Sequence, residues 1–184
     1  MLNNLTKSFT QLSGCLQTPP TAWLKVGGPD AADFLQGQCT QDLRSLKPGQ
    51  LAHGLWLNIK GRVQAESLIL RGSDDHFWLW SAHSPGEALA ARLLEFIIAD
   101  DVTVENYGAS WTQLTLAGPL AAAWLIEKDT PPPKVGEWCS FQGGILFPGR
   151  PGQADLWEWL RPTELAAVAL PSALDQLSEN DLMR

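Results

Sequence analysis

The sequence predicts an α+β fold made of two repeated ferredoxin-like halves, each with the strand-helix-strand-strand-helix order of a split βαβ unit. One observation is a match without gaps, at an offset of 90 residues, between segments 24–35 and 114–125. A second is a later echo, in which a Trp-rich strand precedes a proline and an Ala/Leu stretch, at 77–98 and again at 156–170. Two matches in the same order indicate an internal duplication, with halves related by a pseudo-two-fold axis.

The first half is expected to span residues 1–108. It begins with a strand near Leu24, which turns at Gly28-Pro29 into a helix. Residues 77–80 form the apolar run Phe-Trp-Leu-Trp, which is typical of a buried strand. A helix follows, and residues 102–105 are expected to supply a closing strand.

The start of that later helix has a clear signature. Ser84 and Glu87 have capping-box spacing, and Pro85 is expected at the first helical position. The apolar residues then recur at helical spacing and form one stripe, which consists of Leu89, Leu93, Phe96 and Ile97. We expect Arg92, which lies outside this stripe, to face solvent.

The second half is expected to span residues 109–184, with Gly118-Pro119 as the corner equivalent to that of the first half. The prolines at 130–133 favour an extended connector. A strand is expected over 156–160, followed by an Ala/Leu helix after Pro162. No C-terminal barrel is expected after this half.

Composition narrows the classes of partner. The net charge of -7 argues against nucleic acid or an anionic membrane as the main partner, and an anionic small molecule would need a local cluster of Arg and Lys. Nine Trp imply a large aromatic core, in which we expect Phe34, Leu93 and Trp124 to be buried. No apolar run is long enough for a membrane span.

Cysteine and histidine usage indicates the compartment and disfavours a metal site. The three Cys lack CxxC spacing, which disfavours both a disulfide framework and zinc, and a reducing, cytoplasmic location is expected. The three His lack paired metal spacing, so no metal is expected. No nucleotide-binding or nucleophile-elbow motif is present.

Two stretches resemble a known family. Residues 28–43, with the turn at 46–49, resemble the opening helix and turn of the glycine cleavage T-protein (aminomethyltransferase) family. The hairpin Leu57-Asn58-Ile59-Lys60-Gly61-Arg62-Val63 resembles the LN-x-KGR hairpin of its YgfZ-type branch, as do residues 97–102. That branch binds tetrahydrofolate and is linked to iron–sulfur cluster maintenance. The resemblance implies a fold like the T-protein folate-binding domain.

The chain also departs from the family pattern. The family's Asp pair, one member of which is catalytic, matches Ala65 and Glu66 here. The K-G-C-Y-x-G-Q-E signature of the YgfZ-type branch is absent from the sequence, which indicates a short form without the barrel. The resemblance therefore implies ligand binding without robust turnover, and no catalytic residue is assigned.

The ligand-binding candidates lie mainly on the hairpin. Asn58, Lys60 and Arg62 alternate and would share one strand face, although Gly61 indicates a turn. If this face meets the ligand, the two cations would bind the glutamate carboxylates of a folate and Asn58 the pterin edge. The alternative is that they are surface charges that keep the turn soluble.

Three further candidates are Gln38, Asp42 and Glu66. Gln38 and Asp42 follow the first helix, where polar residues also serve as turn formers. Glu66 is the carboxylate nearest the expected catalytic position, and its alternative is an exposed strand residue.

The leading interpretation is a protein that binds a reduced folate, a tetrahydrofolate-like anion, in a cleft between the halves. It would act as an accessory factor in iron–sulfur or one-carbon metabolism. One alternative is a folate-dependent aminomethyl transferase that uses Glu66. Another is a protein-interaction scaffold that has lost the ligand. A protein partner or a homo-oligomer is left open.

Overall fold

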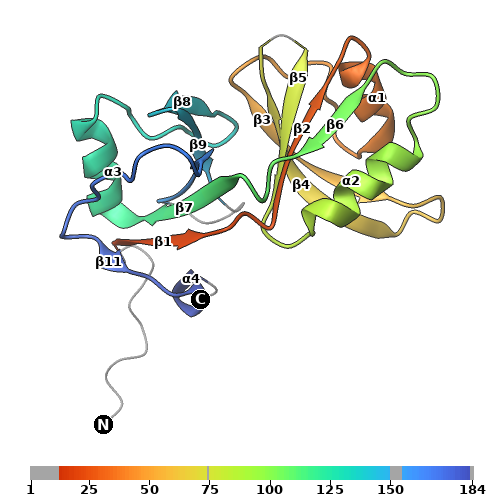
Figure 1. Cartoon of the computed structure of the whole chain (residues 1–184). Helices are drawn as coiled ribbons and strands as arrows, with labels where there is room; N and C mark the ends of the chain where they lie inside the picture. The colour runs from red at the N-terminus through yellow and green to blue at the C-terminus, as the bar shows by residue number, and fades with distance from the viewer. Residues whose placement is uncertain (1–12, 74, 150–154, 183–184) are drawn as a thin grey trace. The chain divides into compact units, whose positions relative to one another are not determined.

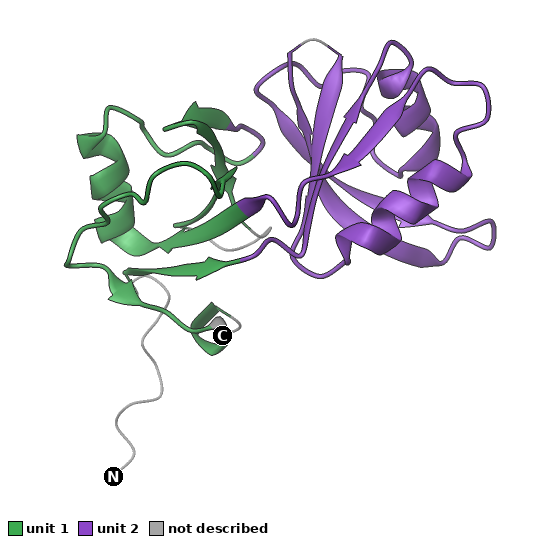
Figure 2. Cartoon of the chain, viewed as in Figure 1, with its two compact units in different colours: residues 1–18, 112–135, 139–184 green, residues 19–111, 136–138 purple. Residues whose placement is uncertain are grey.

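The structure is a computed structural model and describes residues 13–73, 75–149 and 155–182 (Figure 1). The chain divides into two compact units (Figure 2). Unit 1 consists of Met1–Thr18, Thr112–Val135 and Cys139–Arg184, and unit 2 consists of Pro19–Trp111 and Gly136–Trp138.

Unit 2 contains a five-stranded sheet with the order β3-β4-β5-β2-β6, in which all neighbouring strands are antiparallel. The strands are β2 (Ala22–Gly27), β3 (Leu51–Leu57), β4 (Val63–Arg71), β5 (His76–Ser81) and β6 (Thr103–Asn106). The helices α1 (Ala31–Gln38) and α2 (Gly86–Glu95) lie on the same face of this sheet (Figure 1).

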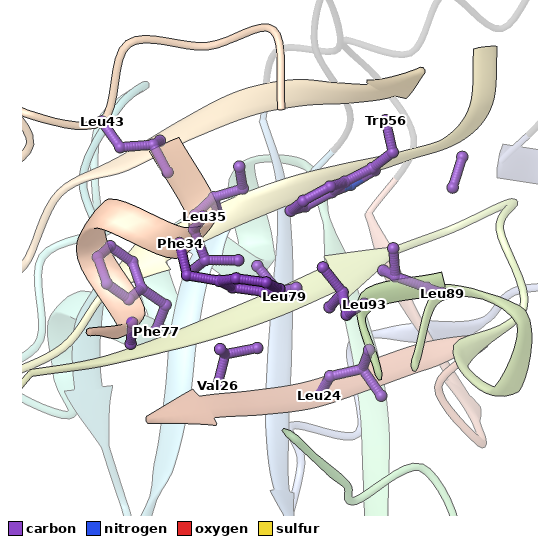
Figure 3. Packing of buried hydrophobic residues seen from close by; sticks show 13 residues of the cluster. Leu24, Val26, Phe34, Leu35, Leu43, Trp56, Phe77, Leu79, Leu89 and Leu93 are labelled. Atoms are coloured by element: carbon purple, nitrogen blue, oxygen red, sulfur yellow. The ribbon is translucent and has the colours of Figure 1, made fainter. Parts of the chain in front are cut away.

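The core of unit 2 lies between these helices and the sheet. Phe34 of α1 and Leu93 of α2 are buried against Leu24 of β2 and Leu79 of β5, and Figure 3 shows their side chains between the elements. On the opposite face of the sheet, the rings of Trp23 and Trp78 stack with centroids 4.6 Å apart. The alternation of strand side chains thus gives this sheet two apolar faces.

Unit 1 contains a six-stranded sheet with the order β11-β1-β7-β10-β9-β8. Its strands are β1 (Gly14–Thr18), β7 (Trp111–Ala117), β8 (Cys139–Phe141), β9 (Gly144–Pro148), β10 (Leu156–Pro162) and β11 (Asp175–Gln176). Helix α3 (Gly118–Glu127) packs Trp124 against Phe141 and Trp159, and α4 (Glu179–Leu182) is a single turn.

The α+β class, the burial of Phe34, Leu93 and Trp124, and the helices after both Gly-Pro corners are confirmed. The duplication into ferredoxin-like halves, with a boundary after residue 108, stays a prediction. In the structure β1 pairs with β7 and β11, so the first described strand belongs to the sheet of the later elements.

Two local predictions are wrong. Ser84 does not cap α2, because its Oγ instead accepts the N–H of Glu66 at 3.0 Å, and Pro85 is the N-cap residue. The Ala/Leu stretch after Pro162 is not helical. Only residues 163–170 lie between Pro162 and Pro171. A segment this short forms a helix of only marginal stability by itself.

Candidate functional site

The side chain of Asn58 stabilises the β3–β4 connection. The N–H of Asn58 donates to the carbonyl oxygen of Arg62 at 2.9 Å. The Asn58 Oδ1 accepts the backbone N–H groups of Lys60 at 2.9 Å and Arg62 at 3.0 Å. Gly61 has φ +71°, which glycine adopts without strain. Residues 58–62 are therefore a turn, and the prediction that these side chains share one strand face is wrong.

The segment after α1 runs along the end of β3. The N–H of Thr40 donates to the carbonyl oxygen of Leu55 at 3.0 Å, and the Leu55 N–H donates to Thr40 Oγ1 at 3.1 Å. Cys39 forms a β-bridge with Trp56. These contacts hold the C-terminal end of α1 beside the β3–β4 turn.

Arg92 joins α2 to both segments. Its Nη2 donates to the carbonyl oxygen of Leu57 at 2.9 Å and to that of Gln38 at 3.4 Å, and its Nη1 donates to Gln38 Oε1 at 3.3 Å. Its guanidinium also lies over the rings of Trp56 and Phe96, at 5.6 and 5.2 Å from their centroids. The expectation that Arg92 faces solvent is wrong, because these partners hold it against the protein.

Arg92 keeps its charge although its burial opposes it. Burial lowers the pKa of Arg92, while the carboxylate of Glu95 acts in the opposite direction. An arginine remains protonated at neutral pH in proteins. The half-buried guanidinium is therefore a fixed cation.

These elements line an open surface pocket of about 370 Å³, which we call the Arg92 pocket. Two predicted ligand residues, Gln38 and Asn58, line it. The other lining residues are Gly37, Cys39, Thr40, Leu57, Ile59, Arg92 and Phe96. Four predicted ligand residues are not in its lining, namely Lys60, Arg62, Asp42 and Glu66.

Lys60 and Arg62 are exposed. They lie in the same turn as the pocket residue Asn58, because their backbone N–H groups donate to its side chain. Asp42 is engaged by Arg44, whose Nε and Nη2 donate to Oδ1 at 2.8 Å and to Oδ2 at 3.0 Å. The Arg44 guanidinium lowers the pKa of Asp42. Asp42 is thus an ionised partner of a surface arginine.

Glu66 belongs to a separate cluster on β4. Ser81 Oγ donates to Glu66 Oε1, and His53 Nε2 lies 3.0 Å from Oε2. Ser81 Oγ also accepts the N–H groups of His83 at 3.1 Å and Ser84 at 2.8 Å. Ala65, the other residue matched to the family's Asp pair, is buried in the core of unit 2. Both Glu66 oxygens therefore already have protein partners.

Cys39 lines the Arg92 pocket, but its thiol is not activated. Burial raises the pKa of Cys39, and this outweighs the opposing hydrogen bond with Gln41 and the charge of Arg92. Nucleophilic cysteines have thiol pKa values below the ordinary value instead. Among the described residues, no group of three or more His, Cys, Asp or Glu side chains is arranged to hold a metal ion.

Arg92 is the residue that sequence reasoning missed. The sequence does indicate that Arg92 borders the core. It lies three residues after Leu89 and one before Leu93, at the flank of the buried stripe. A long side chain at a flank can run along the apolar surface and keep its charged end near water. Its carbonyl partners, however, come from distant segments.

The chain matches the family model of the GCVT N-terminal domain over residues 14–130. It is 32% identical over 96 residues to an aminomethyltransferase of Lysinibacillus sphaericus (strain C3-41), covering 52% of this chain and 26% of that protein. It is 30% identical over 128 residues to the aminomethyltransferase of Thermoanaerobacter sp. (strain X514), covering 68% of this chain and 34% of that protein.

A sesamin methylene transferase of Sinomonas sp. (strain No.22) is 31% identical over 97 residues, covering 51% of this chain and 20% of that protein. The chain thus spans between a fifth and about a third of the length of these relatives. The fold is similar to the crystal structure of glycine cleavage system aminomethyltransferase T from Bartonella henselae, with a TM-score of 0.72 and 23% identity over 84% of this chain and 43% of that chain. No helix among the described residues is long and apolar enough to cross a membrane.

Proposed function

Because the chain belongs to the family of the GCVT N-terminal domain, we propose that it binds a reduced folate, a tetrahydrofolate-like anion, as an accessory factor. The resemblance of hairpin 57–63 to a tetrahydrofolate-binding branch supports this ligand. Relatives named aminomethyltransferase and sesamin methylene transferase support one-carbon chemistry as its setting. A role in iron–sulfur cluster maintenance rests on the YgfZ-type hairpin alone.

The observation that carries the proposal is the grouping of cations around Asn58. Arg92 lines the same pocket as Asn58, and Lys60 and Arg62 bond to its side chain through their backbone N–H groups. A chain with a net charge of -7 repels a polyanion at long range. A folate therefore needs a local positive field, and Arg92, Lys60 and Arg62 are the cations that would supply it in this proposal.

In this proposal, different side chains contact different parts of the folate. Phe96 is a partly exposed aromatic side chain beside the Arg92 guanidinium and offers a flat contact to a ring, and the exposed Ile59 adds an aliphatic contact. The fork of Arg62 suits a carboxylate, and Lys60 adds a flexible point charge. Asp42 and Glu66 make no direct contact in this proposal, because Arg44, His53 and Ser81 already engage them.

A binding role is favoured over turnover by the chemistry of the pocket. No carboxylate lines it among the residues that the structure describes, and its one thiol stays protonated at neutral pH. General acid–base catalysis needs a group of suitable pKa within hydrogen-bond reach of the reacting atom. The described lining of the Arg92 pocket offers none.

The test is calorimetric titration of the full chain with 5-formyltetrahydrofolate. We expect Arg62→Ala to weaken binding by at least about tenfold, or 1.4 kcal/mol. Arg92→Met should weaken it at least as much, and Arg62→Lys should restore only part of the loss, because lysine lacks the fork. The matched control is Arg44→Ala, which removes an exposed arginine of the same unit away from the pocket.

Equal affinity of Arg62→Ala, Arg92→Met and Arg44→Ala would contradict the assignment of the pocket. If the unaltered chain shows no heat of binding at all, the alternative that the protein is an interaction scaffold without a folate ligand is favoured. An aminomethyl-transfer assay addresses the remaining alternative. Turnover that is lost in Glu66→Gln, while folate binding persists, would replace the accessory role with catalysis.

A further inference from the structure

Arg161 is a buried cation at the end of β10, in unit 1. It is 6% exposed, and its guanidinium lies over the ring of Trp159 at 5.1 Å from the centroid. Its Nη2 donates to the carbonyl oxygen of Ala166 at 2.7 Å. Its Nε has no hydrogen-bond partner among the residues that the structure describes. A buried charged group without full pairing is costly, so an anion beside this guanidinium would offset part of the cost.

Arg161 lies in the wall of a second pocket, of about 410 Å³, which we call the Arg161 pocket. Its polar lining is Lys128, Gln142 and Arg161, and its apolar lining is the segment 165–169. Two lining groups are cationic, and no carboxylate is present among its described lining residues. The buried arginine forms the inner part, while Lys128 and Gln142 are exposed.

The apolar wall exists because the segment after β10 is not a helix. Leu165 donates its N–H to the carbonyl oxygen of Pro162 at 3.3 Å, which makes a turn. The bond from Arg161 to Ala166 then holds the following residues across the guanidinium. The segment 165–169 consists of Leu, Ala, Ala, Val and Ala, so the wall presents only apolar side chains.

We propose that the Arg161 pocket binds a small carboxylic acid with an apolar body. The carboxylate would pair with the guanidinium of Arg161 and with Lys128, and the body would lie along residues 165–169. Carboxylate is the matching anion because a guanidinium edge and a carboxylate are complementary planar groups. The pocket volume is within the usual range for small-molecule sites. This site is lined only by unit 1 and does not depend on the folate proposal.

The experiment uses the full chain and saturation-transfer NMR with three probes: hexanoate, hexanamide and inorganic phosphate. Hexanamide has the same body without the charge, and phosphate has the charge without the body. We expect hexanoate to bind and the other two to bind at least about tenfold more weakly. Lys128→Met should weaken hexanoate binding about fivefold or more, since it removes one of two cations.

The control is Lys134→Met, which removes an exposed lysine of the same unit that does not line the pocket. Its hexanoate affinity should equal that of the unaltered chain. Arg161→Lys should bind hexanoate at least about tenfold more weakly, since it loses the planar guanidinium fork. If this variant unfolds, Lys128→Met decides, because Lys128 is exposed and its removal leaves the core intact.

Three results would overturn the proposal. One is equal binding of hexanoate and hexanamide, which would mean that the charge is not recognised. Another is tighter binding of phosphate than of hexanoate. The third is a Lys128→Met variant that binds hexanoate as well as Lys134→Met does.

Discussion

The Nη2 of Arg92 donates to the carbonyl oxygen of Leu57 at 2.9 Å and so ties α2 to the last residue of β3. We expect Arg92→Met to lower the free energy of unfolding by about 1–3 kcal/mol, because charge-assisted bonds are lost and the half-buried Leu57 and Gln38 carbonyls are left without this donor. Urea denaturation measures this change. Arg44→Ala should leave the urea midpoint where it is, and a similar shift in both variants would contradict a specific role for Arg92.

Asn58 should be required for the β3–β4 turn. Asn58→Ala removes the oxygen that accepts two backbone N–H groups, and we expect a loss of about 1–2 kcal/mol in the free energy of unfolding. Asn58→Asp keeps an oxygen in the same place and should retain most of that stability. Thermal and urea unfolding of both variants test this. A destabilised Asp variant beside a stable Ala variant would contradict the turn assignment.

Glu158 on β10 is a buried carboxylate, only 2% exposed. Its Oε2 accepts hydrogen bonds from Gln113 Nε2 and Thr115 Oγ1, both at 2.7 Å. Glu158→Ala removes the buried acceptor of both hydrogen bonds, so we expect the free energy of unfolding, measured by urea denaturation, to fall by at least about 2 kcal/mol. Glu127→Ala, at an exposed position of α3, is the control. Equal midpoints for the two variants would show that the β7–β10 network contributes nothing.

Phe34 should be a main contributor to the core of unit 2, since it is 6% exposed and belongs to the buried cluster between α1, α2 and the sheet. Phe34→Ala should cost about 3–5 kcal/mol, through lost burial and the cavity left behind. Ile98→Ala, whose side chain is 91% exposed, should change little. An unchanged urea midpoint for Phe34→Ala would refute the core assignment.

The cysteines should make stability fall at alkaline pH. Burial raises the pKa of Cys15, Cys39 and Cys139 above the ordinary 9.0. A thiol with a higher pKa in the folded state binds its proton more tightly there. The stability that each protonated thiol contributes is therefore fully present below pH 9. It is lost as the pH rises through the pKa that the thiol has in the folded state.

The measurement is urea denaturation under reducing conditions, at pH steps from about 8 to about 10.5. The Cys39→Ala variant should lose less stability over this range than the unaltered chain does, because one titrating thiol is gone. Identical pH slopes for the two proteins would show that the Cys39 pKa is the same in the folded and unfolded states.

Local patterns in the chain sufficed to predict several elements. Gly28-Pro29 lies just before α1, Gly118-Pro119 begins α3, and the spacing of Leu89 and Leu93 predicted α2. Helix and strand periodicities depend on near neighbours, and apolar side chains leave water wherever the fold allows. The α+β class followed from the order of these elements alone.

Contacts between distant residues decided the rest. Arg92 lines a pocket because Leu57 and Gln38, which are 35 and 54 residues away in the chain, offer their carbonyl oxygens to it. Asn58 turns the chain instead of facing a strand neighbour, and the Ala/Leu stretch after Pro162 bends back to the guanidinium of Arg161. A side chain's hydrogen-bond partners depend on which segments pack beside it, and that packing arises only when the whole chain has folded.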